Sequence, residues 1–344
     1  MTSFNYLWQG SAVTGAAIAV EGLTKRFGDV VALDGIDFEA PERSVFGLLG
    51  PNGAGKTTAI RILATVLEPD GGHASVLGRD VVRDPDGVRR SIGLAGQYAA
   101  VDPNLTGREN LRLIGLLTQM SSTDISPRAA ALLGRFDLTD AADRPAKTYS
   151  GGMRRRLDIA AALMPRPPVL FLDEPTTGLD LYSRNELWDM IRELVEEGTT
   201  VLLTTQYLEE ADRLAQRIAV VDQGRVIAND APSVLKAQLG NTVAEMGFDE
   251  ETGAERAREL LARAHPAERE GSVVRLSTNE GPRVLIGVLR ELDVAGLSPA
   301  TLTVHEPSLD DVFLKLTGRH AESADATTEQ PTPGRRRRRR GAAA

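Results

Sequence analysis

Residues 50–58, Gly-Pro-Asn-Gly-Ala-Gly-Lys-Thr-Thr, have the composition and spacing of a loop that holds phosphate groups. They fit the pattern G-x-x-x-x-G-K-[ST] without a mismatch. The glycines let such a loop curl until successive backbone N–H groups point at phosphate oxygens. We expect Lys56 to reach the β- and γ-phosphates of a nucleotide and Thr57 to ligate Mg²⁺. The predicted binding residues are Gly50, Pro51, Asn52, Gly53, Ala54, Gly55, Lys56, Thr57 and Thr58.

Two carboxylates, Asp173 and Glu174, follow an apolar run at residues 169–172 that is typical of a buried strand. Open α/β sheets place their ligands at the carboxyl ends of strands. Asp173 is suited to holding Mg²⁺ directly or through water. Glu174 is suited to polarising an attacking water, which is the help that phosphoryl transfer needs from a protein.

Weaker signals accompany these two motifs. Ser150, Gly151 and Gly152 precede a helical pattern and predict a second anion site at a helix N-terminus, although a Ser-Gly-Gly turn alone is a weak signal. Phe27 precedes the phosphate loop, where it either stacks on a nucleotide base or belongs to the core. Asp180 has the position of a helix cap, and Gln206 stands just past a strand-like run.

Alternating elements are needed to hold these residues. Apolar runs predict strands at 45–49, 91–94, 169–174, 200–204 and 218–222, and helical spacing predicts helices at 57–67, 154–164, 181–197 and 209–214. Residues 18–20 and 31–38 predict antiparallel strands, and residues 108–136 predict helices inserted between strands. Beyond residue 239 a βαβαβα order predicts a small α+β domain.

The composition limits the classes of protein that fit. A length of 344 residues allows two domains, and no run approaches the roughly 20 apolar residues of a membrane-spanning helix. Residues 1–17 lack the features of a secretory signal. The absence of cysteine excludes disulfides, and the four histidines show no metal-ligand spacing, so we expect no structural zinc site.

The charge is divided unevenly along the chain. The net charge is −8, but six arginines stand together at Arg335 to Arg340 and leave 34 basic residues against 48 acidic ones. A body this acidic is a poor general binder of nucleic acid, so we expect no specific nucleic acid partner. From Ala321 the composition cannot fold by itself. The arginines are either a solvated tail or a contact with anionic lipid head groups.

The order of these motifs resembles the nucleotide-binding subunits of ABC transporters over roughly residues 18–239. The resemblance rests on the phosphate loop, Gln97, the signature-like stretch Tyr149 to Met153, the strand ending at Glu174, and the loop 178–180. It implies an α/β fold, namely a P-loop NTPase with an ABC-type nucleotide-binding domain, a helical subdomain and an antiparallel β subdomain. A small C-terminal α+β domain follows.

The resemblance also implies an activity and partners. ATP would be hydrolysed between two copies in a head-to-tail homodimer, with Ser150, Gly151 and Gly152 of one copy closing over the phosphate loop of the other. Phe27 matches the adenine-stacking position and Gln97 the residue that senses Mg²⁺ and water. The loop at Gln97 and the helices after it would contact a separately encoded integral membrane permease. The chain would then lie peripherally on the cytoplasmic face of the cell membrane.

Two departures from the family pattern concern the site. Tyr149 and Met153 replace the usual Leu and Gln of the signature, and Gln206 stands where a switch histidine is expected. Glutamine can donate and accept hydrogen bonds but cannot become cationic near neutral pH. The retained Glu174 predicts that hydrolysis persists at a modest rate. The catalytic candidates are therefore Glu174, Gln206 and Gln97, and those for Mg²⁺ are Thr57, Gln97 and Asp173.

Several stretches are similar to the daunorubicin-resistance branch of bacterial drug exporters, notably residues 204–212 and 305–313. This predicts an ATPase that powers export of an amphipathic drug or antibiotic. The alternatives are a non-transport ABC ATPase acting on nucleic acid or ribosomes, and an ATP-gated clamp with negligible hydrolysis.

The expected organisation has five parts: an extension at 1–17, the nucleotide-binding domain at 18–239, its helical subdomain at about 98–163, an accessory domain at 240–318 and a tail at 319–344. We interpret the accessory domain as a dimer-stabilising or regulatory appendage, and a drug-sensing pocket at its interface is the alternative.

Overall fold

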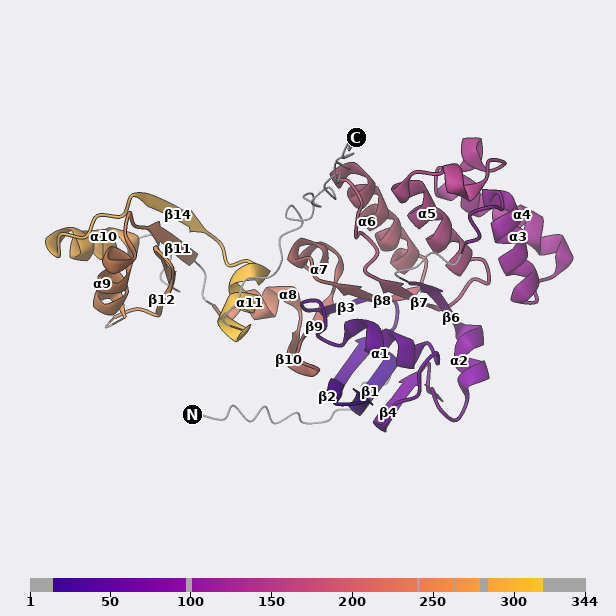
Figure 1. Ribbon diagram of the computed structural model, residues 1–344, viewed down its shortest axis with the longest axis horizontal. Coiled ribbons are helices and arrows are strands. Elements are labelled where there is room, and N and C mark those ends of the chain that lie inside the picture. Colours follow the sequence, from indigo (N-terminus) through magenta and orange to yellow (C-terminus); the bar gives the residue numbers. More distant parts are fainter. Residues whose placement is uncertain (1–14, 97–100, 240–241, 263, 279–283, 318–344) are drawn as a thin grey trace, which may run out of the picture.

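The computed structural model describes residues 15–96, 101–239, 242–262, 264–278 and 284–317 (Figure 1). Gln97 and Arg335 to Arg340, which the sequence singled out, lie outside the described residues. Two groups of elements are visible in Figure 1: a larger body, and a smaller accessory unit that contains β11 to β14.

A six-stranded sheet forms the centre of the body. Its strands are β3 (Val45–Leu49), β6 (Ile92–Ala95), β7 (Val169–Asp173), β8 (Thr200–Thr205), β9 (Arg217–Asp222) and β10 (Arg225–Asp230), in the order β10-β9-β3-β8-β7-β6. All neighbours are parallel except β9 and β10. Three parallel strands, β3, β7 and β8, therefore end side by side at the edge where the sequence places its polar motifs.

A second sheet is antiparallel, as the sequence predicted for residues 18–20 and 31–38. It contains β1 (Ala16–Phe27), β2 (Val30–Pro41), β4 (Gly71–Val76) and β5 (Arg79–Asp80), in the order β2-β1-β4-β5. The long strands β1 and β2 pair along most of their length. This sheet and α1 (Lys56–Leu63) share one hydrophobic core with one face of the central sheet.

Helices cover the rest of the body. They are α2 (Pro85–Ser91), α3 (Gly107–Leu117), α4 (Ser122–Arg135), α5 (Gly151–Ala162), α6 (Leu181–Glu196), α7 (Leu208–Leu214) and α8 (Pro232–Ala237), with short 3₁₀ turns at Thr139–Ala141 and Ala146–Thr148. The body has two cores, one on each face of the central sheet, because side chains alternate along a strand. The core that contains residues of α3 to α8 is called the helical core. On β3, Val45 and Leu49 belong to the helical core, whereas Phe46 and Leu48 belong to the core shared with α1.

The accessory unit has its own four-stranded antiparallel sheet, in the order β12-β13-β11-β14. Its elements are β11 (Thr242–Gly247), α9 (Glu251–Leu261), β12 (Ala267–Glu270), β13 (Val273–Thr278), α10 (Val284–Val294) and β14 (Thr301–His305). Its core is separate from both cores of the body. Strand β12 was not predicted from the sequence, because this edge strand is largely exposed and charged and has no alternating pattern.

The last helix, α11 (Leu309–Thr317), does not belong to the accessory core. Its buried residues Leu309, Val312 and Phe313 join the helical core of the body, beside Leu235 and Leu239. The chain thus leaves the body after α8, forms the accessory unit and returns to the body with α11, as Figure 1 shows. The accessory domain that we expected at residues 240–318 remains a proposal, but its last helix, α11, packs against the body.

Candidate functional site

The phosphate loop connects β3 to α1, as the sequence predicted. Gly55 is the N-cap of α1 with φ of 108°, a conformation that favours glycine. A Cβ atom on Gly50 would collide with the carbonyl oxygen of Val221, so the loop also needs glycine where it passes β9. Lys56 is 4% exposed, and its Nζ donates to the carbonyl oxygens of Gly50 at 2.7 Å and Pro51 at 3.0 Å. The lysine ammonium therefore lies over the mouth of the loop.

Asp173 lies beside this loop, at the end of β7. Its Oδ1 accepts hydrogen bonds from Thr57 Oγ1 at 3.1 Å and from Thr204 Oγ1 at 2.6 Å. The Thr57 hydroxyl and the Asp173 carboxylate are hard oxygen donors, which is the donor type that Mg²⁺ prefers. Two such oxygens next to a phosphate loop fit a magnesium ion, and both residues were predicted for that role.

Glu174 follows Asp173 in a left-handed conformation, with φ of 49°. Its backbone N–H donates to Thr204, at 3.2 Å to the carbonyl oxygen and 3.0 Å to Oγ1. Its Oε1 lies 3.7 Å from Lys56 Nζ, and its Oε2 accepts from Thr177 Oγ1 at 3.3 Å. A left-handed glutamate is held by its surroundings, and such backbone strain is concentrated at functional sites.

Gln206 comes directly after β8, whose last residue contacts the phosphate loop. The Gly50 N–H donates to the Thr205 carbonyl oxygen at 3.2 Å, so the start of the loop is tied to the residue before Gln206. The Gln206 Oε1 atom is buried and has no hydrogen-bond partner. The structure therefore brings the phosphate loop, Asp173, Glu174 and the segment of Gln206 together.

The Ser-Gly-Gly turn is held by different elements. Ser150 is the N-cap of α5, and its Oγ accepts from the Met153 N–H at 3.2 Å. A Cβ atom on Gly152 would lie 3.1 Å from Ser183 Oγ, so α5 begins beside the first turn of α6. Asp180 caps α6 by accepting from the Ser183 N–H at 2.8 Å, and that hydrogen bond lowers the pKa of Asp180. Ser150, Gly152 and Asp180 thus lie at two adjacent helix N-termini.

The two unusual residues of this turn have structural contacts. Tyr149 is buried, and its hydroxyl donates to the Ala141 carbonyl oxygen at 2.6 Å. Burial raises the pKa of Tyr149. Met153 packs against the helical core. Tyrosine in place of the family's leucine therefore adds a buried hydrogen bond beneath the turn.

Phe27, at the end of β1, is 50% exposed and does not belong to the core. The Lys25 ammonium lies 5.8 Å from the centre of its ring. Of the two readings that the sequence left open, the buried one is wrong. An exposed aromatic face remains available for a base.

Sequence reasoning missed two residues that organise the site, Thr204 and Arg155. Thr204 bridges Asp173 and the backbone of Glu174, as described above. Arg155, on α5, donates to the carbonyl oxygens of Gly96, Asp173 and Pro175 and to the carboxylate of Asp158. Burial lowers the pKa of Arg155. Because three of its four acceptors are backbone carbonyls, no spacing of residue types could have revealed this role.

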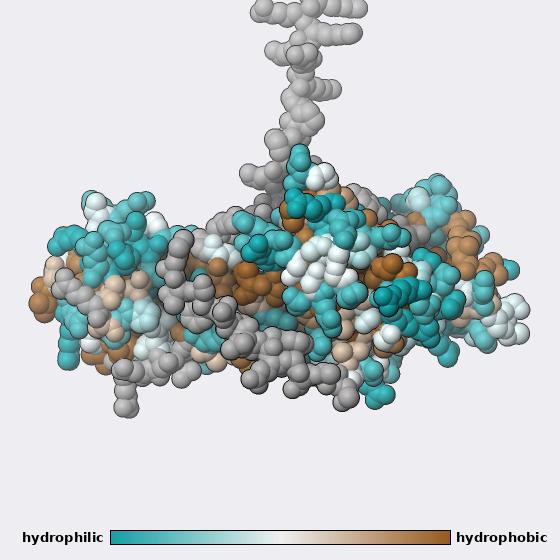
Figure 2. All heavy atoms as spheres, turned by 90° about the horizontal axis from the view of Figure 1, so that it is seen from below, coloured by the Kyte–Doolittle hydropathy of each residue, from teal (hydrophilic) through white to brown (hydrophobic). Residues whose placement is uncertain are grey.

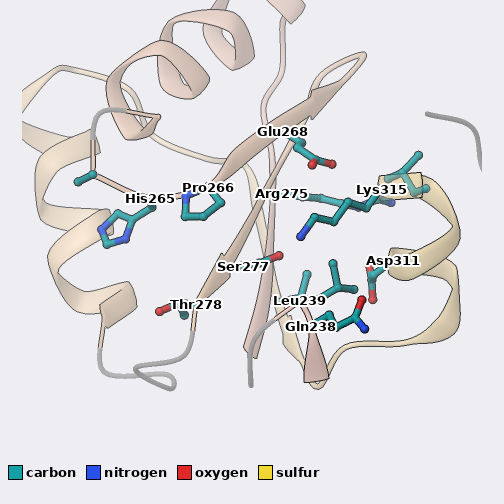
Figure 3. Close-up of a pocket in the computed structure, with 13 residues that line it drawn as sticks. Gln238, Leu239, His265, Pro266, Glu268, Arg275, Ser277, Thr278, Asp311 and Lys315 are labelled. Atoms are coloured by element: carbon teal, nitrogen blue, oxygen red, sulfur yellow. The ribbon is translucent and has the colours of Figure 1, made fainter. Parts of the chain in front are cut away.

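A pocket lies between the body and the accessory unit (Figure 3). It has a volume of about 360 Å³, and its lining includes Glu268, Arg275, Asp311 and Lys315. At the same junction Glu245, His305 and Asp311 hold ligand atoms within 4.8 Å of one another. Glu245 pairs with Arg275 at 2.6 Å, and Asp311 accepts from Ser308 Oγ at 2.7 Å. These contacts make the trio part of the junction, and the drug-sensing alternative stays a prediction.

Exposed apolar side chains gather on α3. Leu113, Leu116 and Leu117 are 40%, 55% and 69% exposed. Figure 2 shows hydrophobic surface at the end of the molecule where α3 and α4 lie. Within the described residues, none of the helices has the length and hydropathy needed to span a bilayer.

Comparison with known proteins gives relatives for nearly the whole chain. Residues 33–177 match the sequence profile of a family described as ABC transporter. A daunorubicin resistance ATP-binding protein of Streptomyces coeruleorubidus is 51% identical over 91% of this chain and 98% of its own length. A doxorubicin resistance ATP-binding protein of Mycobacterium tuberculosis is 44% identical, over 89% and 95%. A Nod factor export ATP-binding protein of Ralstonia nicotianae is 38% identical, over 88% and 94%.

Solved structures agree with these relatives. An ATP-binding subunit of an ABC transporter superposes with a TM-score of 0.59 at 27% identity, over 64% of this chain and 92% of its own. A dimeric post-hydrolysis state of an ATP-binding cassette bound to ADP and Pi superposes with a TM-score of 0.58 at 27% identity, over 62% and 98%.

Proposed function

The chain belongs to the family of ABC transporter ATP-binding proteins, and from this premise we propose that it powers export of an amphipathic drug or antibiotic through a separately encoded permease. Members of this family bind ATP and hydrolyse it. The substrate class is inferred from the daunorubicin and doxorubicin resistance proteins, which are similar over nearly their whole length.

One observation carries the proposal: the end of β7 faces the phosphate loop. Asp173 Oδ1 lies 3.1 Å from the hydroxyl of Thr57, and Glu174 Oε1 lies 3.7 Å from the ammonium of Lys56. Asp173, which would bind the metal ion, and Glu174, which would polarise water, thus lie next to each other at the place where the terminal phosphate would bind. This arrangement supports hydrolysis rather than binding alone.

Each predicted residue receives a role within this proposal. The backbone of Gly50 to Thr58 and Lys56 would hold the phosphates, and Thr57 and Asp173 would hold Mg²⁺. The metal ion, when bound, would neutralise charge on the phosphate oxygens. Glu174 would orient the attacking water as its proton acceptor, and Gln206 would hydrogen-bond near the terminal phosphate. Phe27 would stack on adenine. Gln97, outside the described residues, keeps its expected role at the water and Mg²⁺.

Subunits of this family dimerise, and we propose that the Ser-Gly-Gly turn completes the site of a second copy. The N-termini of α5 and α6 begin side by side, so Ser150, Gly151 and Gly152 present N–H groups on one surface together with Asp180. A terminal phosphate between this surface and the phosphate loop of the partner copy would join two helix N-termini. Its loss on hydrolysis would remove the join.

The proposed permease contact lies on the helical part of the body. The three exposed leucines of α3 follow helical spacing and form one apolar strip, which a partner would cover. The chain would therefore lie peripherally on the cytoplasmic face of the membrane. Arg335 to Arg340 would add attraction to anionic lipid, worth up to about 1 kcal/mol per arginine near the surface.

The test measures hydrolysis and transport together. Full-length chain and its permease in inverted membrane vesicles should hydrolyse MgATP and accumulate daunorubicin. Glu174→Gln should bind ATP with unchanged affinity and lower kcat by roughly 100-fold or more, because the proton acceptor is lost. Equal turnover of the wild type and Glu174→Gln would refute hydrolysis at this site and favour an ATP-gated clamp. Hydrolysis without drug accumulation would refute only the substrate class.

A further inference from the structure

Glu210, on α7, is a completely buried carboxyl group that the proposed reaction does not use. Its exposed fraction is 0%, and one of its oxygens, Oε1, accepts from the Trp188 indole N–H at 3.2 Å. The other oxygen, Oε2, is buried without a hydrogen-bond partner. A buried group of this kind is costly unless it is neutral or well paired.

The surroundings of Glu210 connect three segments of the body. Trp188 belongs to α6, Thr205 is the last residue of β8, and Thr176 follows β7. The hydroxyls of Thr205 and Thr176 both face the carboxyl group, and each acts to lower its pKa. Thr176 is itself 1% exposed, and its Oγ1 is buried without a hydrogen-bond partner.

These residues connect Glu210 with the two segments that carry Glu174 and Gln206. Thr176 lies two positions after Glu174, and Thr205 immediately precedes Gln206. Thr205 also accepts the N–H of Gly50. A single carboxyl group therefore faces the segment of Glu174 and the segment of Gln206.

The charge state of Glu210 follows from burial. Loss of solvation is the largest effect on this group and raises its pKa, against the opposing influence of Thr205, Trp188, Thr176 and the charge of Arg184. Arg155 also acts on Glu210, but its guanidinium already donates to Asp158 and to three carbonyl oxygens. A protonated carboxyl can donate from Oε2 to Thr176 Oγ1 and satisfy both unpaired oxygens at once.

We propose that Glu210 is a neutral carboxylic acid that positions Glu174 and Gln206, by holding Thr176 and Thr205 to α7. The inference rests on the proposed roles of Glu174 and Gln206 and adds a residue that acts through both. Glu210 touches neither nucleotide nor water. The proton on Glu210 makes a hydrogen bond that holds the site together and takes no part in hydrolysis.

The proposal is tested by replacing Glu210 with a residue that keeps a hydrogen-bond donor at this position and with one that has none. In Glu210→Gln the amide donates as a protonated carboxyl does, whereas Glu210→Leu fills the space without a donor. Thr176→Val removes the hydroxyl partner. The control is Glu209→Gln, because Glu209 is half-exposed on the same helix and its pair with Arg213 is exposed.

The readout is kcat and KM for MgATP of the full chain with its permease, from about pH 6 to about pH 10. The kcat of the wild type should decline toward alkaline pH as Glu210 loses its proton. Glu210→Gln should keep kcat within about threefold of wild type and show no such decline, since it cannot be deprotonated. Glu210→Leu and Thr176→Val should each lower kcat by roughly tenfold with KM within about twofold, and the double variant should be no worse than either single one.

Two kinetic results would overturn the proposal. A Glu210→Gln variant as slow as Glu210→Leu would mean that the negative charge is needed, and a Glu210→Leu variant with wild-type kcat would mean that Glu210 positions nothing. If Glu210→Leu does not fold, Glu210→Gln and Thr176→Val still decide.

The thermal unfolding of the full chain tests the neutral carboxyl without hydrolysis. Because the folded state holds the proton more tightly than the unfolded chain, the stabilisation is complete below the unfolded pKa and is lost as pH rises through the folded pKa. The wild type should lose Tm toward alkaline pH more steeply than Glu210→Gln. Equal slopes would refute a neutral Glu210, whereas absent turnover in the wild type would instead refute the proposed function.

Discussion

At the scale of single residues, one hydroxyl group contacts both the carboxylate of Asp173 and the backbone of Glu174. Thr204 Oγ1 donates to Asp173 Oδ1 at 2.6 Å and accepts from the Glu174 N–H at 3.0 Å. Thr204 is 0% exposed, so both hydrogen bonds are shielded from water. The hydroxyl therefore fixes the metal-binding carboxylate and the left-handed backbone of its neighbour with one atom.

Replacing Thr204 by valine should disturb the site without changing its volume. Thr204→Val removes one hydrogen bond from Asp173 Oδ1 and leaves the Glu174 N–H with only the Thr204 carbonyl oxygen as acceptor, at a cost of about 1–3 kcal/mol in the free energy of unfolding. We expect kcat to fall by roughly tenfold or more, because Asp173 and the backbone of Glu174 each lose one of the hydrogen bonds that position them. Thr204→Ser, which keeps the hydroxyl, should recover most of the activity in a steady-state ATPase assay. Equal loss in both variants would show that the methyl group matters instead.

The missing histidine at position 206 gives a second prediction. An imidazole there would become cationic near its ordinary pKa of about 6.5, whereas Gln206 stays neutral. Gln206→His should raise kcat severalfold and introduce an acidic limb into the pH profile, and Gln206→Ala should lower kcat. The pH dependence of single-turnover hydrolysis checks both. A Gln206→His variant with an unchanged profile would show that position 206 does not reach the phosphate.

At the scale of elements, Arg155 links α5 to the ends of two strands. Its guanidinium donates to the carbonyl oxygen of Gly96, just after β6, and to that of Asp173, at the end of β7. Since Ser150 caps the same helix, the Ser-Gly-Gly turn and the carboxylates share one rigid connection. The planar fork of arginine suits several acceptors at fixed angles better than a lysine ammonium does.

Removing this fork should therefore reduce both stability and activity. Arg155→Lys keeps the charge but cannot serve all the carbonyl oxygens, so we expect a loss of about 2–4 kcal/mol in urea unfolding and a lower kcat. Arg154→Lys is the matched control, because Arg154 is the exposed neighbour on α5. It should stay within about 0.5 kcal/mol of wild type. Similar losses in the two variants would contradict the link.

The sequence predicted the elements better than it predicted the contacts between them. Strands β3, β7 and β8 and the phosphate loop have strong local signals, and the structure contains each of them. Helix α1 ends at Leu63 rather than at the expected Leu67, because the chain turns at Thr65 with φ of 58°. Thr204, Arg155 and Glu210 act through contacts between segments far apart in the chain. No local pattern of residue types records such contacts.

At the scale of the whole molecule, α11 returns to the body after the accessory unit. Phe313 is 4% exposed within the core that also contains Leu235 and Leu239. The body is therefore completed by residues that follow the accessory unit in the chain. His305, Glu245 and Asp311 meet where the two parts join.

Excising and truncating the accessory unit should have different effects. A variant in which a flexible Gly-Ser linker replaces residues 242–305 keeps α11, and its body should unfold close to the wild-type temperature. A chain that stops after Leu239 loses the packing of Phe313, and burial of a phenylalanine is worth about 3–5 kcal/mol. Its Tm should be several degrees lower by calorimetry. Equal Tm values for the two variants would show that α11 does not support the body.

The position of α11 late in the chain also affects how the body folds during synthesis. Bacterial and other ribosomes add roughly 5–20 residues per second, and domains ordinarily fold as soon as they emerge. The 70 residues from Leu239 to Leu309 therefore delay the arrival of α11 by about 4 to 14 s. During that interval the apolar surface that α11 covers, around Leu235 and Leu239, lacks this helix. Nascent chains paused within the accessory unit should be bound by chaperones at this surface.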